Sequence, residues 1–384
     1  MRPALLLLAV LVPALCAGCD DGPTGAKPDP SAVTSISAGA NHTCAVAGSG
    51  VAFCWGDDWY GQLGDGFSVR SPEPVPTFGD LTFSSISAGA THTCGLTQGG
   101  RAYCWGRNYR GQLGDGTEVT ALTPVAVAGE LAFIALSAGS TSTCGVATDG
   151  AGYCWGSNSY GLLARVSTDR SPLPLRVGEL TFSSISVGAS HACGVATNGA
   201  GYCWGSNYYG LTGNGTSGGY RPAPDTVVGE YSFRTITAGT GHTCGLTTDG
   251  AALCWGRTDF GRLGNGAAVP DGTTSSPVAV TGGLVFETIE AGGDHTCAIT
   301  QGGAAYCWGG NTAGQLGDGT NTDRPYPVSV RGGLAFRSVD AGDRHTCGVT
   351  RDGLAYCWGD NQYGELGDGS SGPSNHPVQV GLVR

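Results

Sequence analysis

The stretch that decides the fold is His92-Thr-Cys-Gly-Leu-Thr-Gln-Gly-Gly-Arg-Ala-Tyr-Cys-Trp-Gly106. Its two cysteines are ten positions apart, and a Trp-Gly pair follows the second cysteine. The same arrangement occurs seven times, with first cysteines spaced 49 to 53 residues apart. A period of this length is typical of solenoids and propellers. The pairs are Cys44 with Cys54, Cys94 with Cys104, Cys144 with Cys154, Cys193 with Cys203, Cys244 with Cys254, Cys297 with Cys307, and Cys347 with Cys357.

Each repeat contains four short strand-like runs, shown by the last unit at residues 327–330, 334–342, 345–350 and 355–359. A lone four-stranded sheet exposes both faces, and stacking blades around an axis buries them. Four strands repeated seven times therefore predict an all-β, seven-bladed β-propeller. Because the chain ends in Pro377-Val-Gln-Val380, which resembles the first strand of a unit, we expect this C-terminal strand to complete the N-terminal blade and close the ring.

The loop between the paired cysteines indicates a β-hairpin. In the third unit it reads Thr148-Asp149-Gly150, and Gly supplies the positive φ of a three-residue hairpin loop. The even separation then places Cys144 opposite Cys154, within disulfide range. Zinc sites favour ligands two to four residues apart, so a metal pair is the weaker alternative. We predict one disulfide in each blade, which requires an oxidising compartment.

The N-terminus predicts an exported chain. An apolar run, Ala4 to Val12, is too short for a permanent membrane helix and suits a signal peptide. It leads into Cys16-Ala-Gly-Cys19, which resembles a bacterial lipoprotein signal with lipidation at Cys19. The predicted domains are a signal peptide at 1–18, a tether at 19–32 and the propeller at 33–384. The expected location is a membrane-anchored lipoprotein in the periplasm or on the cell surface; the alternative is a secreted soluble protein cleaved near Ala17 or Gly18.

Charge and motifs exclude several function classes. The chain carries 19 basic and 30 acidic residues, a net charge of −11, and an acidic surface repels phosphate backbones. We therefore predict no nucleic-acid partner and contact with a membrane only through the lipid anchor. No nucleophile–base arrangement or phosphate loop stands out, which predicts a non-enzyme with no catalytic residues and no cofactor.

The repeats resemble those of the RCC1 (regulator of chromosome condensation) family. The matching residues in the second unit are Ala88-Gly89, His92-Thr93, Trp105-Gly106, Asn108 and Gly111-Gln112-Leu113-Gly114. The resemblance implies a seven-bladed propeller over 33–384, and the paired cysteines suit an exported version. The eukaryotic namesake is a nuclear nucleotide-exchange factor that binds chromatin, so an exchange-factor role for this chain rests on family analogy alone.

Two other relatives of that fold bear on function. Plant ultraviolet receptors use a Gly-Trp-Arg-His-Thr motif, whereas the residues before His here are pairs such as Ala90-Thr91, so the resemblance does not extend to that chemistry. A secreted bacterial member inhibits β-lactamases through an aromatic-lined face. Inhibition of an extracytoplasmic enzyme is therefore one alternative for this chain.

Two sets of recurring residues suggest metal sites and have simpler explanations. Histidine recurs at one place in six repeats, and Ser142 replaces it in the third. Its fixed place favours a structural hydrogen bond over a metal site on the axis. Asp65, Asp115, Asp318 and Asp368 lie in Leu-Gly-Asp-Gly turns, where an Asx turn explains them better than calcium. We predict no metal site. The histidines are His42, His92, His191, His242, His295 and His345.

The residues that vary among repeats are the better binding candidates. Aromatic residues and Arg on loops are typical interface anchors, and the candidates are Trp59, Tyr60, Arg107, Tyr109, Arg110, Tyr208, Tyr209, Tyr220 and Phe260. A longer loop at 267–276 is a second candidate. The leading interpretation is a protein-binding or scaffold module at the bacterial cell envelope. Recognition of a cell-wall polymer or saccharide is the alternative within binding. The sequence does not name the partner or the oligomeric state.

Overall fold

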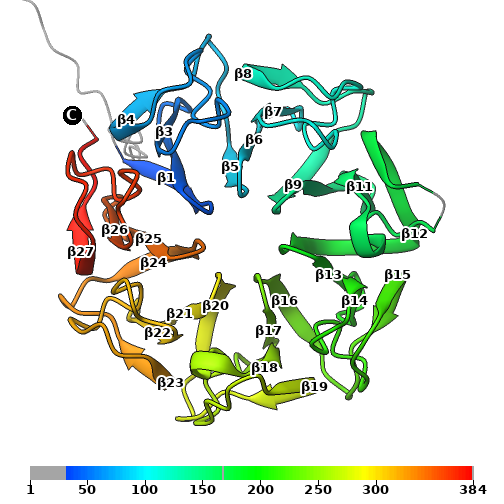
Figure 1. Ribbon diagram of the computed structural model, residues 1–384, viewed down its shortest axis with the longest axis vertical. Coiled ribbons are helices and arrows are strands. Elements are labelled where there is room, and N and C mark those ends of the chain that lie inside the picture. The colour runs from blue at the N-terminus through cyan, green and yellow to red at the C-terminus, as the bar shows by residue number, and fades with distance from the viewer. Residues whose placement is uncertain (1–31, 167, 383–384) are drawn as a thin grey trace, which may run out of the picture.

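The computed structural model describes residues 32–166 and 168–382, and these form a ring of seven radial blades (Figure 1). Within each blade the chain runs outward from the axis through four antiparallel strands. Five blades are separate four-stranded sheets, such as β1-β2-β3-β4. The third and fourth blades share one long strand, β12 (Arg170–Val187), and so form a single seven-stranded sheet. Among the described residues, no helix is long and apolar enough to cross a bilayer.

The strands fall into four concentric sets, with β12 serving in the first set for blade 4 and in the fourth set for blade 3. The innermost strands are β1 (Val33–Ala38), β5 (Ser85–Ala88), β9 (Phe133–Ala138), β16 (Phe233–Ala238), β20 (Phe286–Ala291) and β24 (Phe336–Ala341). The second strands are β2 (His42–Ala47), β6 (His92–Leu96), β10 (Ser142–Ala147), β13 (His191–Ala196), β17 (His242–Thr247), β21 (His295–Thr300) and β25 (His345–Thr350). The third strands are β3 (Ala52–Gly56), β7 (Ala102–Gly106), β11 (Ala151–Ser157), β14 (Gly201–Ser206), β18 (Ala252–Arg257), β22 (Ala305–Gly309) and β26 (Ala355–Gly359). The outermost strands are β4 (Ser71–Pro76), β8 (Ala121–Ala126), β15 (Tyr220–Thr226), β19 (Thr273–Ala279), β23 (Arg324–Ser329) and β27 (Ser374–Gln379), and two short 3-10 turns, η1 (Ser159–Gly161) and η2 (Asp259–Gly261), follow third strands.

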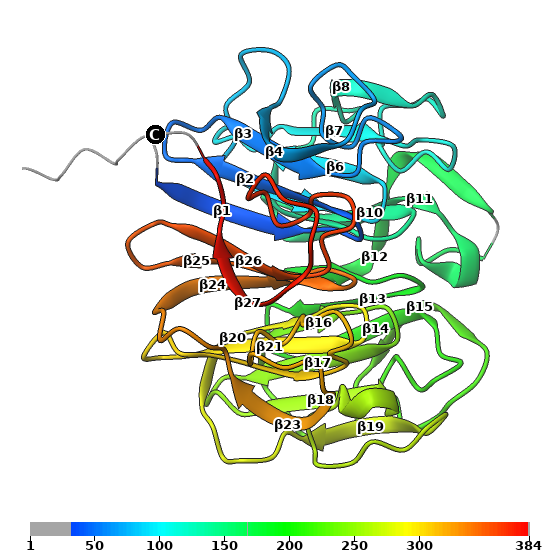
Figure 2. The same cartoon turned by 60° about the vertical axis from the view of Figure 1, so that its left-hand side comes forward.

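The predicted closure of the ring by the C-terminal strand is wrong. β27 pairs with β26 and is the outermost strand of its own blade, so each Pro-Val-x-Val strand ends the unit before it. The physical reason is the position of β1: its free edge faces the axis, and a strand paired there would fill the central cavity. The last blade instead packs side by side with the first (Figure 2), and Val380 is buried in the same cluster as Val33 and Trp55.

The predicted hairpins and disulfides are confirmed. In every blade the two cysteines lie directly opposite each other in the register of the second and third strands. All seven pairs are bonded, with Cα atoms 4.0 to 4.1 Å apart and no solvent exposure. Each disulfide therefore ties the second strand of a blade to the third. The bonds join Cys44 to Cys54, Cys94 to Cys104, Cys144 to Cys154, Cys193 to Cys203, Cys244 to Cys254, Cys297 to Cys307, and Cys347 to Cys357.

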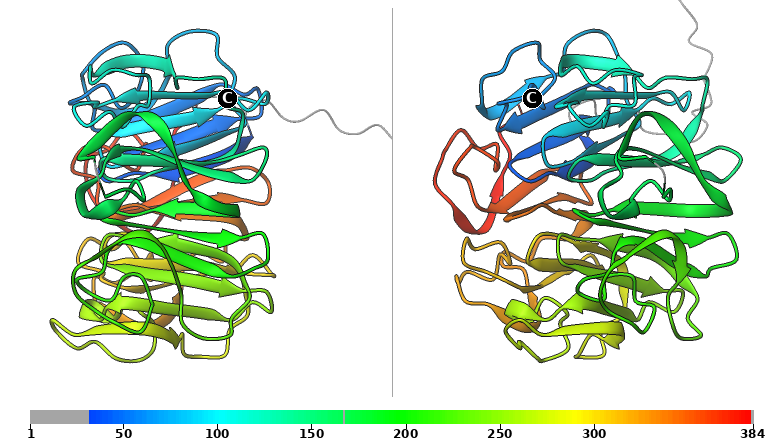
Figure 3. Two further views of the ribbon diagram at one scale, coloured as in Figure 1. Left: turned by 90° about the vertical axis from the view of Figure 1, so that its right-hand side faces the viewer. Right: turned by 45° about the vertical axis from the view of Figure 1, so that its right-hand side comes forward.

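The interface between two neighbouring blades, here called a seam, is built around the tryptophan that follows each second cysteine. These seven indoles are fully buried, and each Nε1 donates to a backbone carbonyl of the preceding blade at 2.8 to 3.0 Å. Gly64 lies against Trp105 with φ of +74°, and a Cβ there would approach Nε1 to 2.5 Å. Glycine is required here for both conformation and space. The view of the ring from its side shows these stacked blades in succession (Figure 3).

Each recurring histidine forms the structural hydrogen bond that its fixed place predicts, and the bond crosses a seam. His42 Nε2 lies 2.8 Å from Thr93 Oγ1, while Thr93 donates its own proton to the Gln62 carbonyl. His42 Nε2 must therefore be the donor, and Nδ1 is left buried without a partner. Charging the ring would add a second buried donor, and burial accordingly lowers the pKa of His42 to about 3. The same bond joins His92, His191, His242, His295 and His345 to the next blade.

The seam between blades 3 and 4 lacks this bond because both partners differ. Ser142 replaces the histidine and bonds within its own blade to the Ser157 carbonyl. Ala192 stands where the next blade would supply threonine. At the same seam Ala164 replaces the glycine that packs against tryptophan, and it keeps a positive φ of 55°. This seam instead has β12, which runs unbroken from one blade into the next.

Candidate functional site

The loops that follow the third strands form one face of the ring, which we call the turn face. Each of these loops begins beside the turn that joins the first two strands of the same blade, as in the bond from Asp57 N to the Asn41 carbonyl at 2.8 Å. The innermost strands end at this same face, so the mouth of the axial cavity lies at its centre. The turn face therefore combines variable loops with a central opening.

Five side chains of blades 1 and 2 form the aromatic–arginine patch, which comprises Trp59, Tyr60, Arg107, Tyr109 and Arg110. The Arg107 guanidinium lies 4.2 Å from the Tyr60 ring centre across the seam and 4.1 Å from that of Tyr109. Arg110 lies 5.1 Å from the Tyr109 ring. Trp59, which precedes Tyr60 in the chain, is 77% exposed. Cation–π stacking holds the side chains in place while one large aromatic surface stays open to solvent.

The backbone beneath the patch is rigid. Tyr60 N donates to Gln62 Oε1 at 2.9 Å, and Leu63 N donates to Asp58 Oδ1 at 2.9 Å. Asp58 is fully buried, and burial raises the pKa of its carboxyl to about 7. The second blade makes the equivalent bond from Leu113 N to Asn108 Oδ1 at 3.0 Å. The loops thus present a pre-formed surface, which lowers the entropic cost of binding.

The aspartates of the Leu-Gly-Asp-Gly turns make the Asx turns that their spacing predicts. Asp115 Oδ1 accepts from Thr117 N at 2.9 Å and also from the Asn108 amide at 3.1 Å. Asp65, Asp318 and Asp368 accept from the backbone two residues on in the same way. Within 32–166 and 168–382, no three His, Cys, Asp or Glu side chains are grouped as a metal site would require.

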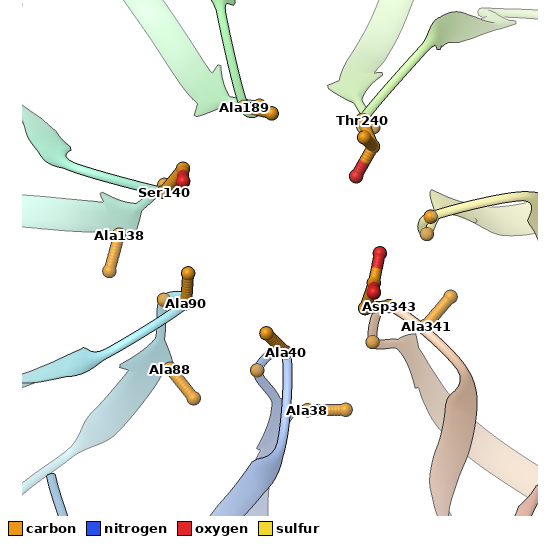
Figure 4. Close-up of a pocket in the computed structure, with 18 of the residues that line it drawn as sticks. Ala38, Ala40, Ala88, Ala90, Ala138, Ser140, Ala189, Thr240, Ala341 and Asp343 are labelled. Carbon is orange, nitrogen blue, oxygen red and sulfur yellow. The ribbon is translucent and has the colours of Figure 1, made fainter. Parts of the chain in front are cut away.

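The axial cavity is the second feature of the turn face. Its outer part has a volume of about 300 Å³, and its rim carries Ala40, Ala90, Ser140, Ala189, Thr240 and Asp343 (Figure 4). Its inner part has a volume of about 280 Å³. One position of each innermost strand contributes to the inner part: Ser37, Ser87, Ser137, Ser186, Thr237, Glu290 and Asp340. The cavity is therefore neutral along blades 1 to 5 and carboxylate-lined along blades 6 and 7.

Comparison with known proteins identifies the family. The model of the RCC1-like domain matches residues 130–383, and models of the regulator of chromosome condensation (RCC1) repeat match residues 33–62, 83–112, 49–96 and 99–146. The chain belongs to the RCC1-like domain family. The fold agrees: Prp20p of Saccharomyces cerevisiae superposes with a TM-score of 0.78 at 20% identity, covering 92% of this chain and 87% of that one. Human WBSCR16 superposes with a TM-score of 0.77 at 20% identity, covering 86% and 93%.

Curated relatives share only part of their length with this RCC1-like domain. The human probable E3 ubiquitin-protein ligase HERC3 is 35% identical over 89 residues, which are 23% of this chain and 8% of that protein. The ultraviolet-B receptor UVR8 of Arabidopsis thaliana is 31% identical over 105 residues, which are 27% of this chain and 24% of that protein. Each of these two proteins is therefore matched over less than a quarter of its own length.

The RCC1-like propeller places all nine predicted interface residues at the turn face, in separate groups. Tyr208 forms an edge contact with Tyr160, with ring centres 6.1 Å apart, and Tyr209 lies 5.0 Å from the Arg257 guanidinium. Phe260 and Tyr220 are exposed; Phe260 is the middle residue of η2, and Tyr220 is the first residue of β15. The predicted loop at 267–276 is shorter in the structure, because β19 begins at Thr273, and the loop is anchored by Thr258, whose hydroxyl donates to the Val269 carbonyl at 2.7 Å.

Sequence reasoning missed Tyr160, Arg257 and the axial carboxylates. Arg257 follows Trp-Gly in the fifth repeat, just as Arg107 does in the second, and this equivalence was the available signal. Glu290 and Asp340 occupy a position that is Ser or Thr in the other five repeats. This change from a hydroxyl residue to an acidic residue in two adjacent repeats was the signal that could have pointed to the cavity.

Proposed function

We propose that this chain is an exported, lipid-anchored binding module of the bacterial cell envelope that docks a protein partner on the aromatic–arginine patch of its turn face. The observation that carries the proposal is the stacking of Arg107 between Tyr60 and Tyr109 across a seam, beside an exposed Trp59. Trp, Tyr and Arg dominate the energetics of protein interfaces. Four residues from two blades held together by cation–π stacking, with an exposed Trp59 next to Tyr60 in the chain, are typical of a built docking site rather than of scattered exposure.

Export is supported by the seven disulfides. Cytosolic thiols are kept reduced, so a chain with a disulfide in every blade needs an oxidising, extracytoplasmic compartment. The signal peptide, Cys19 and most of the tether lie outside the described residues, and the anchor rests on the sequence of residues 4–19. The yeast relative was studied for its binding properties to Gsp1p and histones. An acidic chain in an oxidising compartment favours a different partner.

Replacing Trp59 and Tyr109 by Ala should abolish capture of the partner. We expect protein bands retained from envelope extract by the C-terminally tagged chain to disappear with the double variant, because truncating central aromatic anchors costs about 2 kcal/mol or more each. The matched control is Tyr326→Ala, an aromatic residue that is 48% exposed on the outermost strand of blade 6. Mass spectrometry of the lost bands identifies the partner, and the purified partner is then titrated against both variants.

Two results would contradict the proposal. If the double variant retained the same protein bands as the parent chain, the patch would not be the binding site. Retention of purified cell-wall glycan by the parent chain, lost on the same substitutions, would favour the saccharide-binding alternative.

The lipid anchor has its own test. The Cys19→Ala variant should move from the membrane fraction to the soluble extracytoplasmic fraction, because the thiol that carries the lipid is gone. Immunoblotting of fractionated cells measures the shift, and Cys16→Ala serves as the control that should remain with membranes. Membrane partitioning of Cys19→Ala equal to that of the parent chain would exclude the anchor.

A further inference from the structure

The inner part of the axial cavity carries charge that the propeller does not need. At the lining position the hydroxyl of one blade accepts a bond from the backbone of the next, as in Ala88 N to Ser37 Oγ at 3.0 Å. The pattern continues through Ser87, Ser137, Ser186 and Thr237 at 2.9 to 3.2 Å. A small hydroxyl therefore satisfies this structural role in five blades. Carboxylates at the same place in blades 6 and 7 need another explanation.

The two carboxylates face the cavity without a cation from the chain. Glu290 accepts from Thr237 Oγ1 at 3.1 Å, and the Ser37 hydroxyl and the Ala38 backbone amide partly offset the effect of burial on the pKa of Asp340. Every ion pair of the described residues lies elsewhere. Burial, together with the nearby Asp340, raises the pKa of Glu290 to about 8, and burial raises that of Asp340 to about 6. Both shifts show that ionising these two carboxyl groups in a confined space is costly without a counter-charge.

A second observation points to a missing ligand. Ser184 also lines the inner cavity, and its buried Oγ has no hydrogen-bond partner. Thr288 Oγ1, in the equivalent register of the Glu290 strand, is likewise buried without a partner. Buried polar atoms are nearly always paired, so the unpaired Ser184 hydroxyl in the cavity wall indicates room for a polar guest.

The route to this pocket is apolar. The inner and outer parts of the cavity meet at a collar made of one alanine from each of six blades and Val187 from the fourth. Beyond the collar, Thr240 of blade 5 and Asp343 of blade 7 stand at the rim (Figure 4). A methyl-lined passage that leads to carboxylates and hydroxyls suits an unbranched aliphatic chain with a compact terminal ammonium.

We propose that the axial cavity binds the side chain of a lysine that the docked partner inserts, with its ammonium between Glu290 and Asp340. This inference rests on the proposed function, because the cavity opens at the centre of the face that carries the aromatic–arginine patch. The methylene groups contact the alanine collar, and the ammonium donates to the two carboxylates and the neighbouring hydroxyls. A free alkylamine shares this chemistry and supplies the second arm of the test.

The test measures binding of two probes to the full chain: the peptide acetyl-Gly-Lys-Gly-amide and n-pentylamine. Saturation-transfer NMR with titration detects weak binding and yields Kd. We expect both probes to bind the parent chain, and the Nε-acetyl-lysine peptide not to bind. The double variant Glu290→Ser, Asp340→Ser should fold normally, since Ser occupies this position in four blades, and should weaken both probes by about tenfold or more. The charge-matched control is Glu179→Ser, Glu230→Ser, which removes two exposed carboxylates and should leave Kd unchanged.

Each remaining outcome overturns the inference. Equal binding by the Glu290→Ser, Asp340→Ser variant would place the amine elsewhere. Binding of pentylamine without the lysine peptide would assign the cavity to a small free amine. Binding of the acetylated peptide, or tighter binding of calcium than of either probe, would exclude ammonium recognition. The probes need no partner, so this measurement and the capture experiment on the patch are independent. Either one can fail while the other succeeds.

Discussion

The denatured and reduced chain is expected to remain unfolded when denaturant is removed. Each disulfide closes a loop of about ten residues, and the chain-entropy model assigns about 2.7 kcal/mol to each, or about 19 kcal/mol for seven. Domains of this kind are stable by about 5–15 kcal/mol in total. The blades are thin and rich in Gly, with 69 glycines in 384 residues, so their apolar cores cannot replace the lost constraint.

Far-UV circular dichroism after dilution from denaturant measures this result, with and without prior reduction. The native protein should resist reductant, because every disulfide-bonded cysteine is fully buried. The control is chain denatured without reductant, which should regain its spectrum. As a graded version, replacing Cys244 and Cys254 by Ala should lower the free energy of unfolding by about 3 kcal/mol. Recovery of the native spectrum by the fully reduced chain would contradict the role given to the disulfides.

The Trp255→Ala variant should lose about 3–5 kcal/mol of unfolding free energy. The indole is fully buried at the seam between blades 4 and 5, and its Nε1 donates to the Leu211 carbonyl at 2.8 Å. Its ring lies 6.3 Å from that of Phe233. Truncation leaves a large cavity between two blades. The unfolding free energy of Trp255→Phe should lie between those of Trp255→Ala and the parent chain, because phenylalanine restores volume but not the hydrogen bond.

The chain supplies the control for this experiment. Trp59 is the one tryptophan of the chain that does not follow a cysteine, and it is 77% exposed. Trp59→Ala should therefore change the unfolding free energy by about 0.5 kcal/mol or less. Urea denaturation followed by circular dichroism compares the three variants with the parent chain. A cost for Trp255→Ala as small as that for Trp59→Ala would show that the seams do not depend on the buried indoles.

Local features of the fold were predictable from the sequence. The ten-residue spacing of Cys144 and Cys154 and the Gly that ends their loop determine the register of one hairpin, and that register was correct. The His–Thr motif predicted a structural bond but not its partner: His42 bonds a threonine 51 residues away, and nothing in one repeat says that its partner lies in the next.

The blade to which each Pro-Val-x-Val strand belongs was not predictable in the same way. This strand lies between two units in the sequence. Its alternation of apolar and polar residues fits the sheet of the preceding blade and that of the following blade equally well. Only the packing of β1 against the axis, which leaves no room for a further strand, decides that β27 belongs to the last blade.

For the candidate site, variation among repeats identified most of the patch, because Trp59 and Tyr109 depart from the other units. The axial carboxylates escaped because a single Ser-to-acid change resembles ordinary surface variation until the ring brings Glu290 and Asp340 together in one cavity. Closure of a ring is a long-range property, and the chemistry of its axis emerges only when all seven innermost strands are in place.

The seam between blades 3 and 4 makes the ring mechanically uneven. Six joints carry a His–Thr hydrogen bond, and this one does not. The same joint is spanned by β12, which is both the outermost strand of blade 3 and the innermost strand of blade 4. The joint without a His–Thr hydrogen bond is therefore the joint that a continuous strand spans, and it lies beside Ser137 and Ser186 in the wall of the axial cavity. Flexing at this joint would change the bore of the passage while the disulfides keep each blade intact.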